Sequence, residues 1–173
     1  MYSHRVINVP SIDEIVTEAK KIRRALELCD RKTTPLITID FPIMSCKLAS
    51  LVFSYHVLKK WPSITVHGVY GVASDHSGNN TISHYWIEVQ GVSVDITADQ
   101  YNFIEDDYLN SEIIYCRPFS SVSIGCIGGL PNYNIFKICG RDTYVDGFPE
   151  LGEDFLEELH YCYEALGGAA LYT

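Results

Sequence analysis

The sequence predicts an α+β fold in which a buried helix packs on an antiparallel β-sheet. Two observations carry this prediction. Segments with helical spacing of apolar residues come first, and apolar, β-branched segments joined by short turns follow them. Strands joined by short turns pair antiparallel, and an apolar helix needs another layer to cover it. No repeat, low-complexity tract or linker interrupts the chain, so we expect residues 1–173 to form one domain.

The first helix is expected to begin after Ser11 and to end near Asp30. Ser11 and Glu14 have the spacing of a capping box, in which the serine and the glutamate each bind the other's backbone amide. Apolar residues then recur at helical spacing, namely at Ile15, Ala19, Ile22, Leu26 and Cys29. A basic run lies mostly on the other faces, and it consists of Lys20, Lys21, Arg23 and Arg24. We interpret this run as a solvated surface, with a partner-binding surface as the alternative.

A second helix is expected from Ser45 to Trp61, after a β-rich stretch from Pro35 to Ile39. Ser45 is a suitable N-cap, and Pro62 ends the helix because proline disfavours helical geometry in the residue before it. One face of this helix is apolar and carries Leu48, Leu51, Val52, Tyr55 and Leu58. Cys46 therefore lies in the first turn of a largely buried helix.

The middle of the chain is expected to form strands. Apolar, β-branched segments run from Ile64 to Ala73, from Ile82 to Val89 and from Val92 to Thr97. A loop at 74–81 rich in Ser, Gly and Asn separates the first two segments. Gln90 and Gly91 suit a two-residue hairpin turn between the last two, which would place Val89 opposite Val92.

The last third of the chain has one strong pattern. A closing helix is expected from Leu151 to Leu166, with Gly167 and Gly168 ending it. Its inward residues would be Phe155, Leu159, Cys162 and Leu166. A short strand is expected from Ile113 to Cys116, whereas the region from Ser120 to Tyr144 predicts no regular element.

The overall charge and hydropathy exclude several functional classes. The net charge is −9, and nucleic-acid binding depends on Lys and Arg contacts with phosphates, so we expect no nucleic-acid partner. No apolar run approaches the roughly 20 residues of a membrane span. Residues 1–10 also lack the basic-then-apolar order of a signal peptide. We therefore expect a cytoplasmic protein with no membrane partner, with export by a non-classical route as the alternative.

Six cysteines are spread along the chain without a C-x-x-C pair, which argues against a zinc site and against a disulfide framework. They are Cys29, Cys46, Cys116, Cys126, Cys139 and Cys162. In a reducing compartment most free cysteines are small buried apolar residues. Cys46 differs, because unpaired N–H groups in the first turn of a helix stabilise the thiolate form, which is the nucleophile.

His84 and Asp95 are the expected partners of Cys46. The predicted hairpin places Trp86 opposite Asp95, and His84 lies two residues earlier on the same face of the sheet. His84 and Asp95 would then be diagonal neighbours, with backbones about 7–8 Å apart. A carboxylate in this position orients an imidazole and stabilises its charged form, as in catalytic triads. An acid within the apolar segment 92–96 also needs a polar partner.

These residues resemble the transglutaminase-like branch of the papain-like superfamily. The shared features lie within residues 40–103: Cys46 opens a helix, His84-Tyr85-Trp86 follows on a strand, and Val94-Asp95-Ile96-Thr97-Ala98-Asp99-Gln100 lies on the next. The resemblance implies a papain-like, transglutaminase-core-like fold. It also implies that Cys46 is the nucleophile, His84 the base and Asp95 the third member. Trp86 and Gln100 are close enough in sequence to line the substrate site.

Two features depart from the family pattern. Lys47 follows the nucleophile, where many relatives place a small or aromatic residue. No Gln or Trp directly upstream of Cys46 matches a family oxyanion donor. The triad requires no metal and no organic cofactor, and although some relatives use calcium, the sequence has no acidic loop with calcium-binding spacing.

The expected activity is cysteine-dependent acyl transfer or amide hydrolysis on a protein or peptide substrate, through a thioacyl-enzyme. Deamidation, proteolysis and cross-linking remain open, and a chain without an appended substrate module favours a hydrolase. The alternative from another class is a catalytically inactive member of the fold that binds a partner protein.

Overall fold

A five-stranded antiparallel sheet forms the centre of the fold. The computed structural model describes residues 8–167 and 171, and its strands lie in the order β4-β3-β2-β1-β5. The strands are β1 (Val66–Ser74), β2 (Thr81–Val89), β3 (Val92–Asp95), β4 (Ser123–Cys126) and β5 (Lys137–Tyr144). The first four form a meander, and β5 returns to pair with β1. The predicted α+β class with an antiparallel sheet is confirmed.

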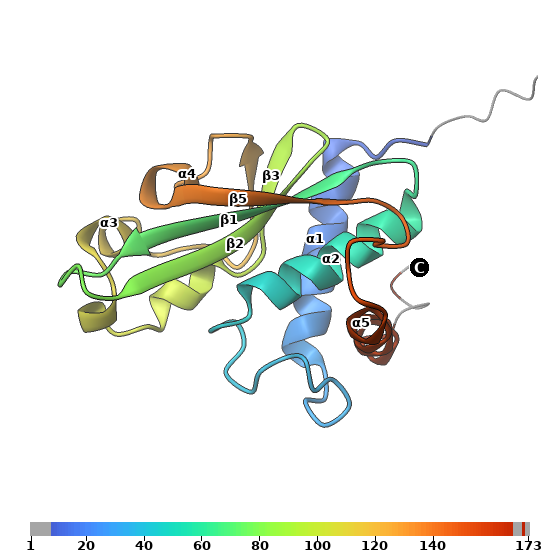
Figure 1. Cartoon of the computed structure of the whole chain (residues 1–173), viewed down its shortest axis with the longest axis horizontal. Helices are drawn as coiled ribbons and strands as arrows, with labels where there is room; N and C mark the ends of the chain where they lie inside the picture. Colours follow the sequence, from blue (N-terminus) through green and yellow to red (C-terminus); the bar gives the residue numbers. More distant parts are fainter. Residues whose placement is uncertain (1–7, 168–170, 172–173) are drawn as a thin grey trace, which may run out of the picture.

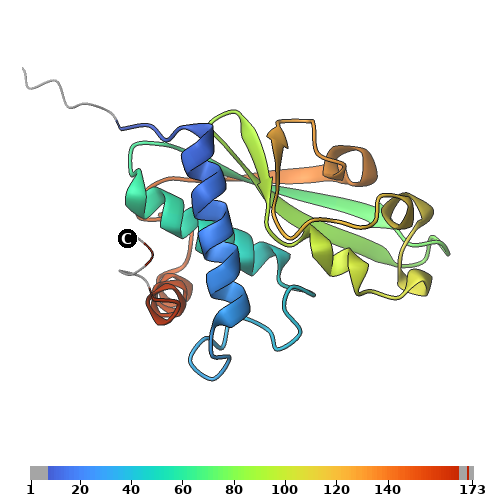
Figure 2. The same ribbon diagram turned by 180° about the vertical axis from the view of Figure 1, so that it is seen from behind.

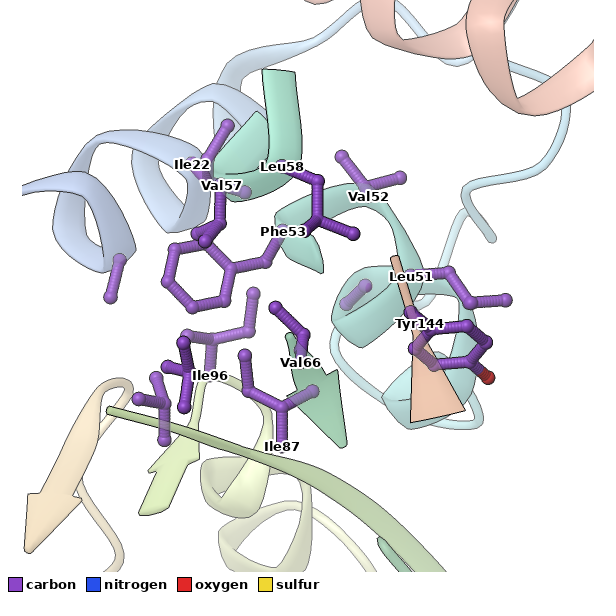
Figure 3. Close-up of a cluster of buried hydrophobic side chains, with 14 of the residues drawn as sticks. Ile22, Leu51, Val52, Phe53, Val57, Leu58, Val66, Ile87, Ile96 and Tyr144 are labelled. Carbon is purple, nitrogen blue, oxygen red and sulfur yellow. The ribbon is translucent and has the colours of Figure 1, made fainter. Parts of the chain in front are cut away.

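Helix α2 (Cys46–Lys60) is largely buried. It packs on β2 and β1 and contacts α1 (Ile12–Leu28) and α5 (Glu153–Ala165), as Figures 1 and 2 show. Buried side chains occur all around α2, as expected for a helix covered by a sheet and by other helices. Phe53 of α2 and Ile87 of the sheet both belong to this core (Figure 3). The prediction of a buried helix that begins at Cys46 and ends before Pro62 is confirmed.

Helix α1 has the predicted capping box and the predicted apolar face. The Ser11 amide donates to the Glu14 carboxylate over 2.8 Å, and the Glu14 amide donates to the Ser11 hydroxyl over 3.2 Å. Ile15, Ala19, Ile22 and Leu26 are fully buried. These contacts fix the start of α1 and attach it to α2.

Arg23 of α1 corrects the interpretation of the basic run as a solvated surface. Its guanidinium is buried and makes two hydrogen bonds to the Asp99 carboxylate, of 2.7 and 2.6 Å. A buried charge is costly unless it is paired, so Arg23 is held by Asp99 and unavailable to a surface partner. Lys20 and Arg24 remain exposed, as predicted.

The hairpin between β2 and β3 has the predicted turn and register. Gln90 and Gly91 have φ values of 51° and 78°, which are typical of the type I′ turn that suits twisted strands. Val89 pairs with Val92, and the ladder continues for two further residue pairs. Continuing the same register places Asp95 opposite Trp86, as predicted.

The two faces of β2 contact different apolar clusters. Ile87 and Val89 face the core around α2. Trp86 lies in a second cluster with residues from the short helices η1 (Ala98–Asn102), α3 (Ser111–Tyr115) and α4 (Asn132–Ile135). Both faces of the end of β2 are therefore buried, and polar residues there must find partners within the protein.

The segment before α2 does not form the predicted β-structure. Residues from Pro35 to Ile39 pass through successive turns, in which the Ile37 amide donates to the Thr34 carbonyl over 3.0 Å. The sheet does not include this segment, so its backbone groups are paired locally. The turns bring the chain back to the start of α2.

The chain between β3 and α5 is more regular than predicted. The prediction of a strand from Ile113 to Cys116 was wrong: this segment belongs to α3, where the Asn110 side chain caps the helix. The region from Ser120 to Tyr144 contains β4, α4 and β5. Helix α4 has only four residues and β5 is mostly exposed, so neither produces an apolar period in the sequence.

The closing helix α5 is confirmed. Leu159 and Cys162 are fully buried, and Phe155 and Leu166 are half-buried against the same core. Gly167 follows the helix with a φ of 96°, a left-handed conformation that glycine adopts easily. Gly168, predicted to end the helix together with Gly167, lies outside the described residues.

Candidate active site

Cys46 is the first residue of α2, and the turn before it leaves the helix uncapped by a side chain. Ser45 occupies the predicted N-cap position, but its hydroxyl makes no capping hydrogen bond. Instead it lies 3.0 Å from the Thr38 hydroxyl and 3.2 Å from the Ile43 carbonyl. Cys46 itself is partly exposed. The first-turn amides of α2 are therefore not occupied by the N-cap side chain, which favours a negative charge beside them.

His84 and Asp95 lie in contact beneath this helix start. The His84 Nε2 is 2.6 Å from the Asp95 Oδ2, and neither side chain is more than 1% exposed. Asp95 also accepts hydrogen bonds from the Thr97 amide (2.9 Å) and from the Asn132 side chain (2.7 Å). Side chains or amides of three residues thus hold the carboxylate in place, and its position fixes which ring nitrogen of His84 it binds.

The charges of His84 and Asp95 stabilise each other. Burial alone lowers the pKa of His84, but the charge and the hydrogen bond of Asp95, together with interactions with Cys46, raise that pKa to about 10. Burial raises the pKa of Asp95, but His84, Thr97 and Asn132 lower it below its ordinary value. Because the Cys46 side chain contributes to the raised pKa of His84, the three predicted residues lie together.

Aromatic rings hold the imidazole from several sides. The His84 ring centroid is 5.3 Å from that of Tyr101, 5.4 Å from that of Phe136 and 6.0 Å from that of Trp86. Trp86 is fully buried within this cluster, so its position does not fit the predicted contact with substrate. It supports the imidazole instead.

Gln100 connects His84 to the turn before α2. Its Nε2 lies 3.2 Å from the His84 Nδ1, and its Oε1 accepts a 3.3 Å hydrogen bond from the Met44 amide. Figures 1 and 2 show the corresponding arrangement, in which η1 lies beside the start of α2. Gln100 is only 3% exposed, so this link belongs to the interior of the site.

Exposed side chains border Cys46 on the surface. Met44 is 81% exposed, and the Lys47 side chain is 62% exposed. The Lys47 ammonium lies 4.0 Å from the Asp142 carboxylate and 5.4 Å from the centre of the Tyr85 ring. Lys47 therefore points along the surface towards β5, which leaves it outside the cluster around His84.

Comparison with family models, with curated protein sequences and with solved structures finds no match to this chain. No helix in the described ranges 8–167 and 171 is long and apolar enough to cross a membrane. Within the same ranges, no three His, Cys, Asp or Glu side chains gather as metal ligands would.

Sequence reasoning missed Asn132, Tyr101 and Phe136. Asn132 and Phe136 come from the region that predicted no regular element, and nothing in their local spacing points to His84. Tyr101 directly follows Gln100, so the resemblance of the segment from Val94 to Gln100 to the family pattern could have pointed to Tyr101 as a residue of the site.

Proposed function

We propose that this protein is a cysteine-dependent acyltransferase or amide hydrolase acting on a protein or peptide substrate. The observation that carries the proposal is the buried His84–Asp95 pair, with Cys46 at the start of α2 close enough to interact with the imidazole. A nucleophile, a base and an orienting acid in this order form the arrangement used in covalent acyl transfer. The helix start over an antiparallel sheet is also compatible with a papain-like, transglutaminase-like fold.

In the proposed reaction, the proton of the Cys46 thiol is held at the His84 Nδ1, and the sulfur attacks an amide carbonyl carbon. The carbonyl electron pair moves to oxygen, and a backbone N–H in the first turn of α2 donates to this oxyanion in the proposed mechanism. When the intermediate collapses, His84 returns the proton to the leaving amine, which departs. Asp95 keeps the imidazole oriented and stabilises its charge throughout.

The thioacyl-enzyme formed in this way is resolved by an acceptor. Water acting on a glutamine-derived acyl group gives deamidation, an amine gives cross-linking, and water acting on a peptide-derived acyl group gives proteolysis. Cys46 is partly exposed and bordered by Met44 and Lys47 at the surface, so an extended or loop segment of a protein has access to it.

Incubation with unfolded casein tests the proposed function and distinguishes the three reactions. We expect the wild-type protein to release ammonia, to incorporate a fluorescent primary amine, or to generate new amino termini. The Cys46→Ala variant, which loses the nucleophile and keeps a small side chain, should lose the activity entirely. Absence of all three products from the wild type, or equal activity of Cys46→Ala, contradicts the proposal.

A further inference from the structure

A cavity of about 650 Å³ lies between the C-terminal half of α2, the segment that follows β5, and α5, three parts of the chain that Figure 1 shows together. Apolar side chains that are buried or half-buried form its walls, namely Tyr55, Leu58, Phe148 and Leu156. The Tyr55 hydroxyl lies 2.7 Å from the Nδ1 of His160, and this contact holds the tyrosine ring against α5. A mostly apolar cavity of this size is typical of a binding site.

The rim of this cavity and a neighbouring hollow on α5 are acidic. The two share Glu157 and His160. Six exposed carboxylates line them, namely Asp146, Glu153, Asp154, Glu157, Glu158 and Glu164. In the part of the chain that the structure describes, Lys59 is the only Lys or Arg lining either one, and its ammonium lies 3.9 Å from the Glu164 carboxylate. The surface therefore attracts cations, and the net charge of −9 adds to this attraction.

Helix α2 connects the cavity to Cys46. The helical rise of about 1.5 Å per residue places Tyr55 about 14 Å and Leu58 about 18 Å along α2 from Cys46. Lys47, next to the nucleophile, lies 4.0 Å from Asp142 of β5, and the chain continues from β5 into the cavity wall. An extended peptide advances about 3.3 Å per residue, so about five residues span the distance from Cys46 to the cavity.

We propose that this cavity binds a segment of the substrate protein in which apolar side chains are flanked by Lys or Arg, about five residues from the amide that Cys46 attacks. The inference rests on the proposed function and deepens it by naming the substrate class. An apolar side chain of the segment displaces water from Leu58 and Phe148. Its flanking cations pair with the rim carboxylates, whereas an acidic segment meets like charges there.

Binding is tested with fluorescent peptides and the Cys46→Ala variant, which excludes any reaction. One short peptide has Leu-Phe at its centre and Lys or Arg on both sides. We expect at least about 10-fold weaker binding, by fluorescence anisotropy, when Ser-Ser replaces Leu-Phe or when Glu and Asp replace the basic flanks. Added salt should also weaken binding of the basic peptide, because it screens exposed charges.

The double substitution Asp146→Lys and Glu157→Lys reverses two exposed rim charges and should weaken binding of the basic peptide about 10-fold or more. The matched control is Glu105→Lys with Asp107→Lys at η2 (Asp106–Tyr108), which changes the net charge equally at exposed positions outside the cavity. It should bind within about 2-fold of the unsubstituted rim, since its charges lie beyond the screening length.

A reaction assay separates the cavity from the proposed chemistry. Its substrate is the same basic peptide, extended to place a glutamine about five residues from Leu-Phe. The rim reversal should raise KM about 10-fold while acylation by p-nitrophenyl acetate, a small ester that needs no cavity, stays at the wild-type rate. The products are ammonia, an incorporated amine or new amino termini.

Three results overturn the inference alone: equal binding of the acidic and basic peptides, equal binding by the rim-reversed and unsubstituted proteins, or a dimer of the wild type that the rim reversal alters, which assigns the cavity to a second copy of the chain. A wild type that binds the basic peptide but acylates with neither the peptide nor p-nitrophenyl acetate overturns the proposed function, and with it the substrate role of the cavity.

Discussion

Asp95→Asn is expected to slow acylation of Cys46 by about 10⁴-fold, the loss found when the acid of a Ser-His-Asp triad becomes an amide. The Asp95 Oδ2 accepts the Nε2 hydrogen of His84 over 2.6 Å. An amide at this position presents an N–H to Nε2 and places the ring proton on Nδ1. His84 then has no free nitrogen to take the thiol proton. Single-turnover acylation by p-nitrophenyl acetate measures the effect.

Asp99→Asn is the matched control for this prediction. It makes the same chemical change at a buried carboxylate only four residues away, but Asp99 binds Arg23 and not His84. We expect Asp99→Asn to lower the free energy of unfolding and to keep the acylation rate of the folded protein. An Asp95→Asn rate within about 10-fold of the wild type would remove Asp95 from the mechanism.

The unfolding free energy of the wild type is expected to fall as the pH rises from about 6.5 to about 10, because His84 binds its proton more tightly in the folded protein. The stabilisation by the His84–Asp95 pair is fully present below the unfolded pKa of 6.5 and is lost as the pH rises through the folded value of about 10. One such group contributes a slope of at most about 1.4 kcal/mol per pH unit. Urea unfolding across this range measures it.

Asp95→Asn separates this slope from the titration of other groups. Without the carboxylate, burial dominates and the pKa of His84 is no longer raised, so the excess slope should disappear. Ionisable groups away from this pair contribute equally to both proteins. Identical slopes in the wild type and Asp95→Asn contradict a charged His84–Asp95 pair in the folded state.

The contact between His84 and Asp95 could be predicted because it depends on local rules. A two-residue turn fixes the register of a hairpin, and the register fixes which side chains share a face. The same applies to Cys46, since a proline at one end and an apolar period define α2. These features need only neighbouring residues in the sequence.

Contacts between distant segments could not be predicted in the same way. The Asn132 hydrogen bond to Asp95 depends on where a four-residue helix packs, and the burial of Arg23 depends on Asp99 reaching it from η1. Ser45 has the residue type of an N-cap, yet the turns before α2 direct its hydroxyl to Thr38. In each case the local sequence is compatible with more than one partner for the side chain, and the packing of distant segments determines which partner it has.

The central claim is that His84 activates Cys46 as a nucleophile. The most direct test is the pH profile of iodoacetamide alkylation at each of the six cysteines, followed by mass spectrometry, in the wild type and in His84→Ala. We predict that Cys46 alone reacts rapidly below neutral pH and that His84→Ala removes this advantage. A Cys46 that reacts like an ordinary thiol in both proteins would contradict the claim and favour a non-catalytic binding domain.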